Sequence, residues 1–567
     1  MPMSRPSQLH VAEVSILPEQ TRNGLLRRVD WRFLLPNPSP AKTVCFATGA
    51  LADAVALISD VVVTGGDGPT ADCDLAVTVD PDETTLRAAW DALRPGGSLY
   101  VEWRSCVWGD GAASRRLRRV GFRDVSSYWP YPNPARYAPQ VWVPLESPAA
   151  LRYFLRQDPA LGSVGFVLRR IGRSLRARLV ANHVYSMCTT ATKPAVDHDS
   201  KTQSAGPATL HRPLPQASLR SGLLETIRGG WVQWGLGPPP DKLVWLLLAR
   251  GTHSSNKVVA AVLAEPRSAP VVAVKMARTP EGAVAIQREA HNLEALKTHR
   301  VRLSGIPQPL FCQRHAGVLT LAETFIAGRP MASHLTRRTF PALVQRAADW
   351  LAVLAAQRGE PRSPGTWKLM VDRTLTRFES CFGAVLDRTL LRETRSALAA
   401  LEPLPTVFEH RDYSPTNILI TSDDQLGVLD WESAEPAGVP FLDLIYFITN
   451  AAFIVDGVWG LGPYPASYQQ TWDPATDVGA IAHQAIRRYA DAAGLESHDL
   501  GALRLLVWLI HAPSEYQRMV ATSASAPPDS LLENSAFVSL WKEELDQRSS
   551  ARTTQPTVGI QTPARRA

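Results

Sequence analysis

The segment at residues 409–420, EHRDYSPTNILI, limits the fold more than any other part of the sequence. It places Asp412 and Asn417 in one short loop between two apolar, strand-like runs. Asp430 follows thirteen residues after Asn417, at the end of a second apolar run, and the turn SDDQ between the runs predicts a hairpin. The hairpin brings Asp430 close to Asn417. A carboxylate at 412 can accept a proton from a hydroxyl, and the oxygens at 417 and 430 suit Mg²⁺.

A lysine in a buried strand supplies the next requirement of phosphoryl transfer, a cation on the nucleotide phosphates. Lys275 lies in VVAVKMAR, a strand-like run. A buried ammonium needs a partner, because an unpaired one is costly. The amphipathic stretch AIQREAHNLEAL carries Glu289 fourteen residues later, with Glu294 as the alternative partner.

These motifs together resemble the aminoglycoside phosphotransferase and choline kinase family over about residues 240–515. The resemblance implies an α+β bilobal protein-kinase-like fold for the C-terminal block, with ATP and Mg²⁺ as cofactors. It implies that Asp412 is the catalytic base and that Asn417 and Asp430 hold Mg²⁺. It also implies that Lys275 binds the α and β phosphates and that Glu289 positions it.

The resemblance extends to less specific segments. The stretch TLAETFIAG is similar to the hinge, which predicts that backbone groups around Leu321–Glu323 contact adenine. The loop ARGTHSSNK, with Gly251, Ser255 and Asn256, is similar to a loose phosphate loop, although a plain hairpin turn fits it equally well. Asp443 matches an aspartate that supports the catalytic loop from a helix.

Three histidine and acidic side chains near these motifs have simpler interpretations. We interpret His410 as a packed, hydrogen-bonded loop residue. Glu432 either assists a second Mg²⁺ or accepts structural hydrogen bonds. His511 is interpreted as a core or helix-cap residue, with substrate contact as the alternative.

The acceptor is expected to be a small molecule. Ser414 stands where protein kinases usually carry a lysine, DWE replaces DFG, and no A-P-E segment follows. We therefore expect an ATP-dependent O-phosphotransferase that acts on a sugar, an aminoglycoside or an amino alcohol. Two alternatives stay open: a bifunctional protein with an active SAM-dependent methyltransferase domain, and a nucleotide-binding pseudokinase scaffold.

The first block alternates strand-like runs with helical stretches, which favours an α/β, Rossmann-like domain. DALRPGGSLYVEW followed by RRVGFRDVSSYW resembles a class I methyltransferase over about residues 40–145. A SAM site needs a Gly-rich first turn, and FATGALAD has Gly49 alone. We expect a degenerate domain that does not bind SAM.

Breaks in composition predict four segments. We expect a methyltransferase-like domain at 1–182, a flexible linker at 183–219, a kinase-like domain at 220–545 and a disordered tail at 546–567. The kinase-like domain divides into an N-lobe at about 220–325 and a C-lobe at about 326–545. Within the first domain, the pattern at residues 163–180 predicts a helix with one apolar face and five arginines. We favour docking of this helix on its own domain over contact with a membrane surface.

Composition narrows the cellular setting. The 567 residues include six scattered cysteines and no CxxC pair, which is typical of a reducing compartment. No signal peptide or membrane-spanning run is indicated, so we expect a cytoplasmic protein. A net charge of +7 is too mild to indicate nucleic acid as a partner, and the sequence does not indicate an oligomeric state.

Overall fold

The computed structural model describes residues 17, 19–65, 70–104, 109–157, 186–195, 218–251, 257–267, 269–298, 303–401, 404–495, 499–522 and 527–554. The chain divides into two compact units. The first comprises Met1–His291 with Pro307–Ala327, and the second comprises Asn292–Ile306 with Gly328–Ala567.

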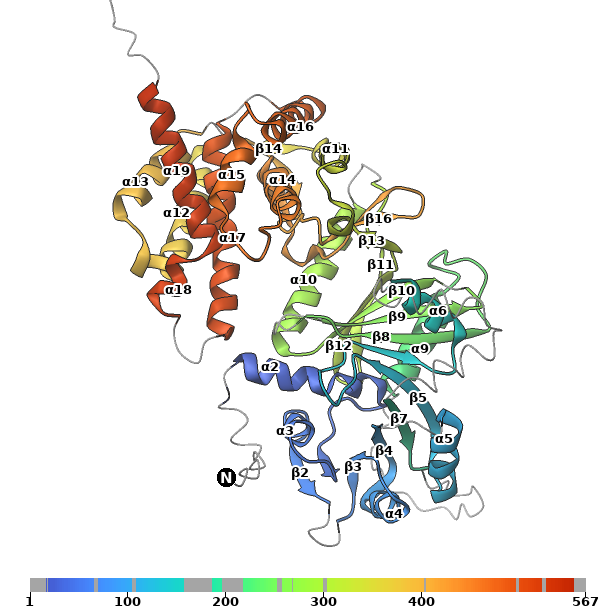
Figure 1. Ribbon diagram of the computed structural model, residues 1–567. Helices are drawn as coiled ribbons and strands as arrows, with labels where there is room; N and C mark the ends of the chain where they lie inside the picture. Colours follow the sequence, from blue (N-terminus) through green and yellow to red (C-terminus); the bar gives the residue numbers. More distant parts are fainter. Residues whose placement is uncertain are drawn as a thin grey trace, which may run out of the picture. The chain divides into compact units, whose positions relative to one another are not determined.

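The first unit is built on one mixed sheet of twelve strands, in the order β11-β12-β10-β9-β8-β6-β5-β7-β4-β3-β1-β2 (Figure 1). The strands are Lys42–Cys45 (β1), Val61–Thr64 (β2), Cys73–Val79 (β3), Leu93–Trp103 (β4), Arg123–Tyr131 (β5), Val141–Pro144 (β6), Met187–Thr192 (β7), Lys242–Leu248 (β8), Lys257–Glu265 (β9), Pro270–Ala277 (β10), Pro309–His315 (β11) and Val318–Thr324 (β12). The strand-like runs expected in the first block include β1, β2, β3 and β4, and the run VVAVKMAR falls on β10.

Strands β2, β1, β3 and β4 are neighbours and run parallel. Helix α3 connects β1 to β2, and helix α4 connects β3 to β4. Asp82 begins α4 as its N-cap, since its side chain accepts the backbone N–H of Thr85 at 2.7 Å. Strand β7 lies antiparallel between β4 and β5. The helices of this unit are Glu19–Arg28 (α2), Asp30–Leu34 (the 3₁₀ helix η1), Ala50–Val55 (α3), Glu83–Ala92 (α4), Gly109–Val120 (α5), Pro148–Gln157 (α6) and Leu219–Gly230 (α9).

The two expected domains of this region share one sheet. Val141 and Trp142 of β6 pair with Leu248 and Leu247 of β8, so the strands of the first block continue into those of the second. One hydrophobic cluster also extends from Leu26 to Ala322 and includes buried residues of both blocks. The predicted boundary between 1–182 and 220–545 is therefore wrong, because the apolar faces on both sides of it pack into a single core.

The predicted linker and tail also need correction. Strand β7 lies inside the range expected to be a flexible linker, 183–219, and it pairs on both edges. The tail expected to be disordered from 546 begins within helix α19, which extends to Thr554. Positions 183–185 and 196–217 of the linker range, and residues 555–567, lie outside the described residues, as does the basic segment 163–180.

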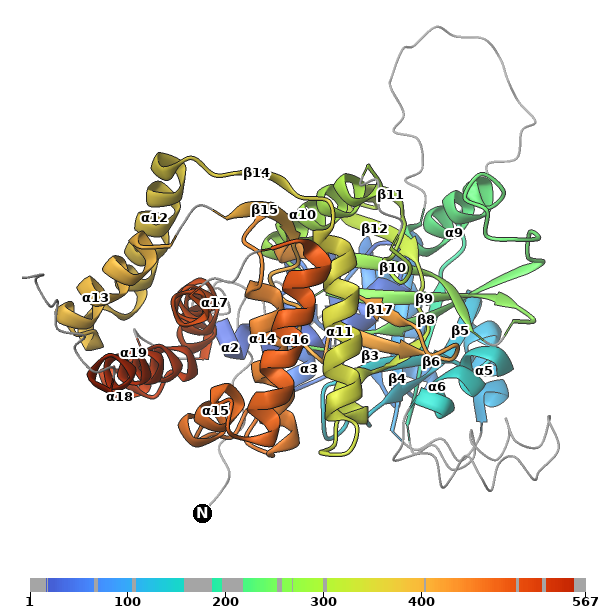
Figure 2. The ribbon, with the colours of Figure 1, turned by 90° about the horizontal axis from the view of Figure 1, so that it is seen from above.

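Helix α10 (Pro280–Lys297) follows β10 and contains the boundary between the units. The second unit is otherwise helical, with two small three-stranded sheets in the described residues (Figure 2). Its helices are Met331–His334 (η3), Phe340–Ala355 (α11), Pro364–Phe382 (α12), Gly383–Val385 (η4), Arg388–Ala399 (α13), Trp431–Ser433 (η5), Leu442–Val455 (α14), Pro465–Trp472 (α15), Asp477–Ala493 (α16), Leu500–Thr522 (α17), Asp529–Glu533 (α18) and Ala536–Thr554 (α19). Its strands are Gly328–Pro330 (β13), Gly359–Pro361 (β14), Pro405–Glu409 (β15), Ile418–Thr421 (β16), Leu426–Val428 (β17) and Glu435–Gly438 (β18).

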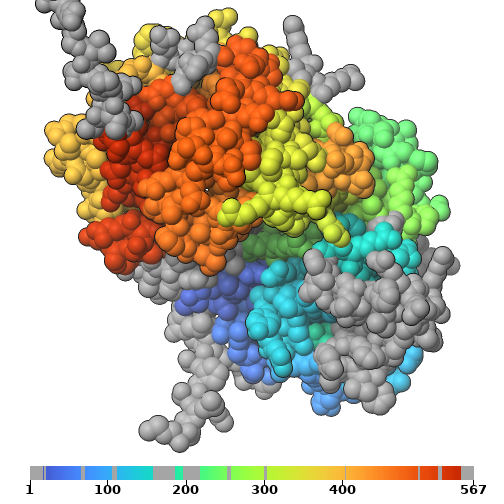
Figure 3. Space-filling view, turned by 45° about the horizontal axis from the view of Figure 1, so that its top comes forward, coloured from blue at the N-terminus to red at the C-terminus, as the bar shows by residue number. Residues whose placement is uncertain are grey.

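Helix α14 is the apolar centre of the second unit, and α11 packs against both α14 and α16. The yellow, orange and red residues of this unit form a continuous packed surface in Figure 3. The amphipathic stretch at 374–401 is divided between α12 and α13, with η4 beginning at Gly383 between them. None of the described helices is long and apolar enough to cross a membrane.

Candidate functional site

The loop between β15 and β16 is held by the buried carboxylate of Asp443 at the start of α14. The two oxygens of Asp443 accept the backbone N–H groups of His410 at 2.6 Å and Arg411 at 2.8 Å. Arg411 has a left-handed backbone, with φ at 61°. This geometry confirms the expectation that Asp443 supports the loop from a helix. Strained backbone of this kind persists only where the surroundings enforce it, and it is common at functional sites.

His410 is packed and hydrogen-bonded, as predicted. Its side chain is fully buried, its Nε2 lies 3.0 Å from the carbonyl oxygen of Leu429, and its Nδ1 accepts the backbone N–H of Asp412 at 3.2 Å. The two contacts together require a neutral ring that carries its proton on Nε2. His410 therefore connects the 412 loop to the strand end before Asp430.

Asp412 and Asn417 contact each other directly. The Nδ2 of Asn417 donates to the Oδ2 of Asp412 at 2.7 Å and to its backbone oxygen at 3.0 Å. These two bonds engage the amide nitrogen and leave the amide oxygen of Asn417 available to a cation. Burial, together with the negative charge of Asp430, raises the pKa of Asp412 to about 7.

Asp430 lies at the end of the predicted hairpin. Strands β16 and β17 pair with Ile418 opposite Val428, and the backbone N–H of Leu429 donates to the carbonyl oxygen of Asn417 at 2.9 Å. The backbone of Asp430 is left-handed, with φ at 68°. The structure therefore brings the three predicted residues Asp412, Asn417 and Asp430 into one neighbourhood.

The chemistry of this neighbourhood fits Mg²⁺. The negative charges of Asp430 and Glu432 both raise the pKa of Asp412, and a divalent cation would relieve this repulsion. In the part of the chain that the structure describes, no three His, Cys, Asp or Glu side chains form a complete metal site. A hard cation here would keep water and phosphate ligands, which is how Mg²⁺ usually binds.

Lys275 lies in a second cluster, within the first unit. Its Nζ contacts Glu289 Oε1 at 2.6 Å, as predicted, and Glu294 instead pairs with the exposed Lys297. Lys275 also contacts Glu323 Oε1 at 2.9 Å, and Lys257 contacts the other oxygen of Glu289 at 2.9 Å. Two lysines and two glutamates therefore form one buried network.

The residues predicted to form the hinge, Leu321–Glu323, belong to a strand. These residues lie inside β12, which pairs with β10 on one edge and β11 on the other. Their backbone groups form the ladder, because Leu321 is opposite Lys275 and Glu323 is opposite Ala273.

The predicted phosphate loop is described only at its ends. Gly251 follows β8 with a left-handed φ of 88°, which requires glycine in most sequences. Lys257 begins β9 at the other end. Ser255 and Asn256 lie outside the described residues.

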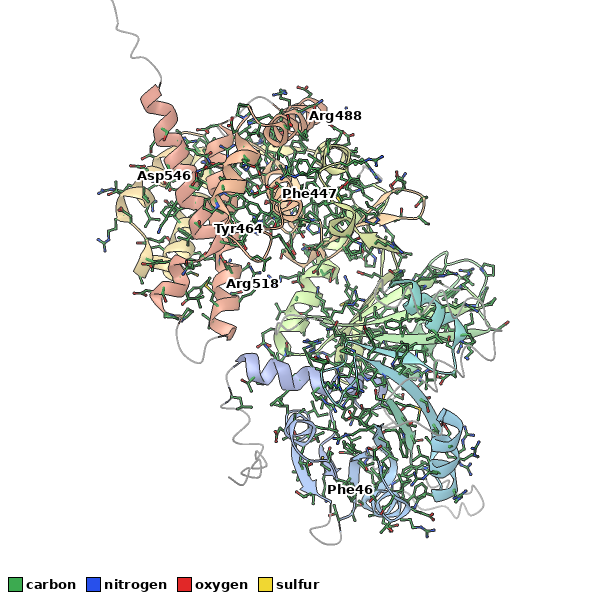
Figure 4. All side chains as sticks on the ribbon, in the orientation of Figure 1. Phe46, Phe447, Tyr464, Arg488, Arg518 and Asp546 are labelled. Carbon is green, nitrogen blue, oxygen red and sulfur yellow. The ribbon has the colours of Figure 1, made fainter. Side chains whose placement is uncertain are left out.

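Helices α14 and α17 provide a polar and aromatic surface beside the 412 loop. The ring of Tyr446 stacks on His511 with centroids 3.9 Å apart and planes 4° apart. Arg518 lies two turns after His511 on the same side of α17 (Figure 4). The charge of Arg518 favours the ionised form of Asp412, while burial lowers the pKa of His511 to about 3 and keeps its ring neutral.

The loop after α14 adds an exposed aromatic residue to this surface. Trp459 is 48% exposed, and its Nε1 donates to the side-chain oxygen of Asn450 at 3.2 Å. Asn450 follows Tyr446 by one helical turn and donates to its backbone oxygen at 2.8 Å. Leu461, in the same loop, is 84% exposed.

Comparison with known proteins agrees with these clusters. Residues 250–479 match the model of the phosphotransferase enzyme family, APH. The match spans less than half of the chain. The matched residues include Lys275, Glu289, Asp412, Asn417 and Asp430.

Solved structures similar to the chain include aminoglycoside phosphotransferase APH(3'')-Id from Streptomyces rimosus. That protein is 17% identical, the match covers 52% of this chain and 97% of that one, and the TM-score is 0.30. A glucosamine kinase is 14% identical over 55% and 94% of the two chains, with a TM-score of 0.31. An aminoglycoside 2'-phosphotransferase-IIIa variant with GDP is 15% identical over 58% and 99%, with a TM-score of 0.33. No curated protein matches the chain.

Sequence reasoning missed three contributors. Lys257 begins a strand whose sequence carries no functional motif. Only the contact of Lys257 with Glu289 in the structure identifies it as part of the network. The side chain of Glu323 faces Lys275, although the sequence pointed to its backbone. Tyr446 occupies an apolar helix, and the stacking partner that distinguishes it is 65 positions away in the sequence.

Proposed function

We propose that this chain is an ATP- and Mg²⁺-dependent O-phosphotransferase whose acceptor is a small molecule with a hydroxyl group. The observation that carries the proposal is the pair Asp412–Asn417. One oxygen of a buried carboxylate is held by the amide, and a pKa of about 7 suits a group that must take up a proton near neutral pH. The match of residues 250–479 to the phosphotransferase family supports it independently.

In this proposal, Asp412 orients the acceptor hydroxyl and accepts its proton as the oxygen attacks the γ-phosphorus. The bond from the γ-phosphorus to the bridging oxygen breaks, and ADP leaves with the electron pair. Asn417 holds the Asp412 carboxylate in place through the 2.7 Å bond. Proximity and orientation account for much of the rate in such reactions.

The proposal assigns the nucleotide to the lysine cluster. Lys275 binds the α and β phosphates, and Glu289 fixes the lysine. Asn417 and Asp430 hold Mg²⁺, which would offset charge on the phosphate oxygens. The acceptor lies against Tyr446 and His511, because these aromatic side chains border the catalytic base in the second unit. A sugar, an aminoglycoside and an amino alcohol remain the acceptor classes to test.

The first test removes the base. We expect Asp412→Asn to lower turnover by about 10²- to 10⁴-fold, the usual contribution of a general base, while ADP binding persists. Asp424→Asn is the matched control, since Asp424 lies in the exposed hairpin turn and pairs with Arg346. ADP release is measured with a panel of sugars, aminosugars, aminoglycosides and amino alcohols, and with Asp430→Ala as the blank. Turnover of the Asp412 variant at the wild-type rate would remove the proposed role.

We also propose that the part of the first unit before β8 is a methyltransferase-like fold that does not bind SAM. The parallel order β2-β1-β3-β4 supports the fold, and in such sheets ligands bind at the carboxyl ends of the strands where the order reverses, here β1 and β3. Phe46 follows β1 directly, and its ring lies against Gly65. A Cβ added at Gly65 would be 2.1 Å from the Phe46 ring. Figure 4 labels this side chain. Calorimetry with SAM tests the proposal, and stoichiometric binding would refute it.

A further inference from the structure

A buried ion pair joins the N-terminal segment to the strand of Lys275. The guanidinium of Arg278 donates from Nε to Asp30 Oδ1 at 2.9 Å and from Nη2 to Asp30 Oδ2 at 2.8 Å. The side chains of Arg278 and Asp30 are 1% and 0% exposed. Bidentate pairs of this kind fix geometry as well as charge.

A second bond from η1 holds the backbone at the same position. Arg32 Nη2 donates to the carbonyl oxygen of Arg278 at 2.7 Å. Both the side chain and the backbone of Arg278 are therefore held by η1, more than 240 residues earlier in the sequence. We call Asp30, Arg32 and Arg278 the N-terminal clasp.

Two further contacts hold this segment on the first part of the sheet. Trp31 stacks on Tyr100 of β4 with centroids 3.7 Å apart and planes 6° apart. Arg28, at the end of α2, makes a bidentate pair with Glu102 of β4, with both distances 2.6 Å. In Figure 1, α2 lies against α3 in the blue part of the chain. Arg28 and Glu102 do not contact Arg278, whose partners in η1 are Asp30 and Arg32.

The clasped residue occupies a sensitive position. Arg278 and Thr279 form the whole connection between β10, which carries Lys275, and α10, which carries Glu289. The 2.6 Å contact between Lys275 and Glu289 depends on the angle at which α10 leaves β10. A change of a few tenths of an ångström at Arg278 would change the distance between the two charges. Catalytic and binding groups lose efficiency when their supporting contacts are loosened by this much.

We propose that the N-terminal clasp positions Lys275 and Glu289 for nucleotide binding, so that Asp30, Arg32 and Arg278 act as positioning residues for the phosphotransferase site. This inference rests on the proposed function for its nucleotide. Residues 1–249 lie outside the family match, so the clasp adds a support for the lysine from a part of the chain that the family model does not include.

The chain offers a matched pair of variants to test this. Asp30→Asn keeps the size of the side chain and removes its charge from the clasp. Glu102→Gln makes the same change in the other buried bidentate pair of the segment, Arg28–Glu102, which does not touch β10. Both variants are made in the full chain, and calorimetry with Mg²⁺ and ADP gives the nucleotide affinity. Native-state hydrogen exchange over residues 270–298 reports on β10 and α10 without any nucleotide.

We expect Asp30→Asn to weaken ADP binding by about 2- to 30-fold, the usual range for a substitution along a coupling network, and to increase exchange over 270–298. Glu102→Gln should bind ADP as the wild type does and leave that exchange unchanged. Arg278→Lys, which keeps the charge and loses the bidentate contact, should shift both measurements in the direction of Asp30→Asn and serves as the test if that variant fails to fold. Equal effects of Asp30→Asn and Glu102→Gln would overturn the clasp and indicate general destabilisation.

The failure of the proposed function has a different signature. If the wild type does not bind ADP, the phosphotransferase assignment fails, and the exchange data alone then decide the clasp. Increased exchange over 270–298 in Asp30→Asn and not in Glu102→Gln supports it, and unchanged exchange in both refutes it.

Discussion

At the scale of single residues, Glu323 shows how burial changes what a side chain does. It lies in β12, between β11 and β10 in the sheet. Its side chain is 3% exposed and contacts Lys275. Lys257 and Glu289 are the other charged groups of the network, so two carboxylates share the same lysine. Burial raises the pKa of Glu323 to about 7, although the positive charge of Lys275 acts in the opposite direction.

This shift predicts a pH dependence of stability. In the unfolded chain Glu323 loses its proton near its ordinary pKa of 4.5, while in the folded protein it keeps the proton until about pH 7. The folded state therefore binds more protons between these values, and the free energy of unfolding from this residue falls as pH rises from 4.5 to 7. Glu323→Gln should lack this fall, as chemical denaturation at a series of pH values can measure.

The control for this prediction is Glu294→Gln, because Glu294 is an exposed acid on α10. Its pH profile should match that of the wild type. Parallel profiles for the wild type and Glu323→Gln would contradict the assigned protonation.

Sequence patterns predicted the chemistry of single residues better than the strand positions and pairing partners of those residues. The spacing from Asp412 to Asn417 to Asp430 predicted one loop and one hairpin. The structure contains both, and Asn417 contacts Asp412 within the loop. The residues predicted as the hinge lie inside β12, because an apolar run indicates a strand and not the residue at which the strand leaves the sheet. The partners of Lys275 beyond Glu289 depend on strand pairing, which only the fold supplies.

At the scale of elements, the pairing of β6 with β8 joins two strand sets that the sequence separates. Trp142 lies at this junction, fully buried, in the cluster that reaches from Leu26 to Ala322. Trp142→Ala should lower the free energy of unfolding by about 3–5 kcal/mol, the usual cost of removing a large buried side chain. Hydrogen exchange should show that β4 and β10 lose protection together, because one core serves both.

Trp459→Ala is the comparison for this variant, since Trp459 is 48% exposed in the second unit. It should change the free energy of unfolding by no more than about 0.5 kcal/mol. Loss of protection in β4 alone after Trp142→Ala would mean that the two strand sets fold independently.

At the scale of the whole molecule, the compact units do not follow the breaks in composition. The polar stretch after residue 182 predicts a linker, yet its residues 187–192, MCTTAT, form a strand paired on both edges. Threonine-rich strands carry little apolar signal, so periodicity could not reveal it. The boundary found in the structure falls within α10 and after Ala327 instead.

Removal of residues 1–217 tests this organisation. The shortened chain would expose the edge of β8 that β6 covers, and it would lack the partner of Arg278. We expect it to aggregate, because an exposed apolar edge strand pairs with other chains. Size-exclusion chromatography beside the full chain measures the outcome, and a monomeric fragment with full ADP affinity would show that the phosphotransferase part folds alone.

The place of β7 in the sheet has a consequence for synthesis on the ribosome. A nascent chain that has reached residue 182 contains β4 and β5 but not the strand between them. Each of these strands then has an unpaired edge that β7 later covers. About ten further residues must be added before β7 is complete, which takes a few seconds or less at ordinary elongation rates. During that interval the growing polypeptide is most exposed to mispairing and most in need of chaperones.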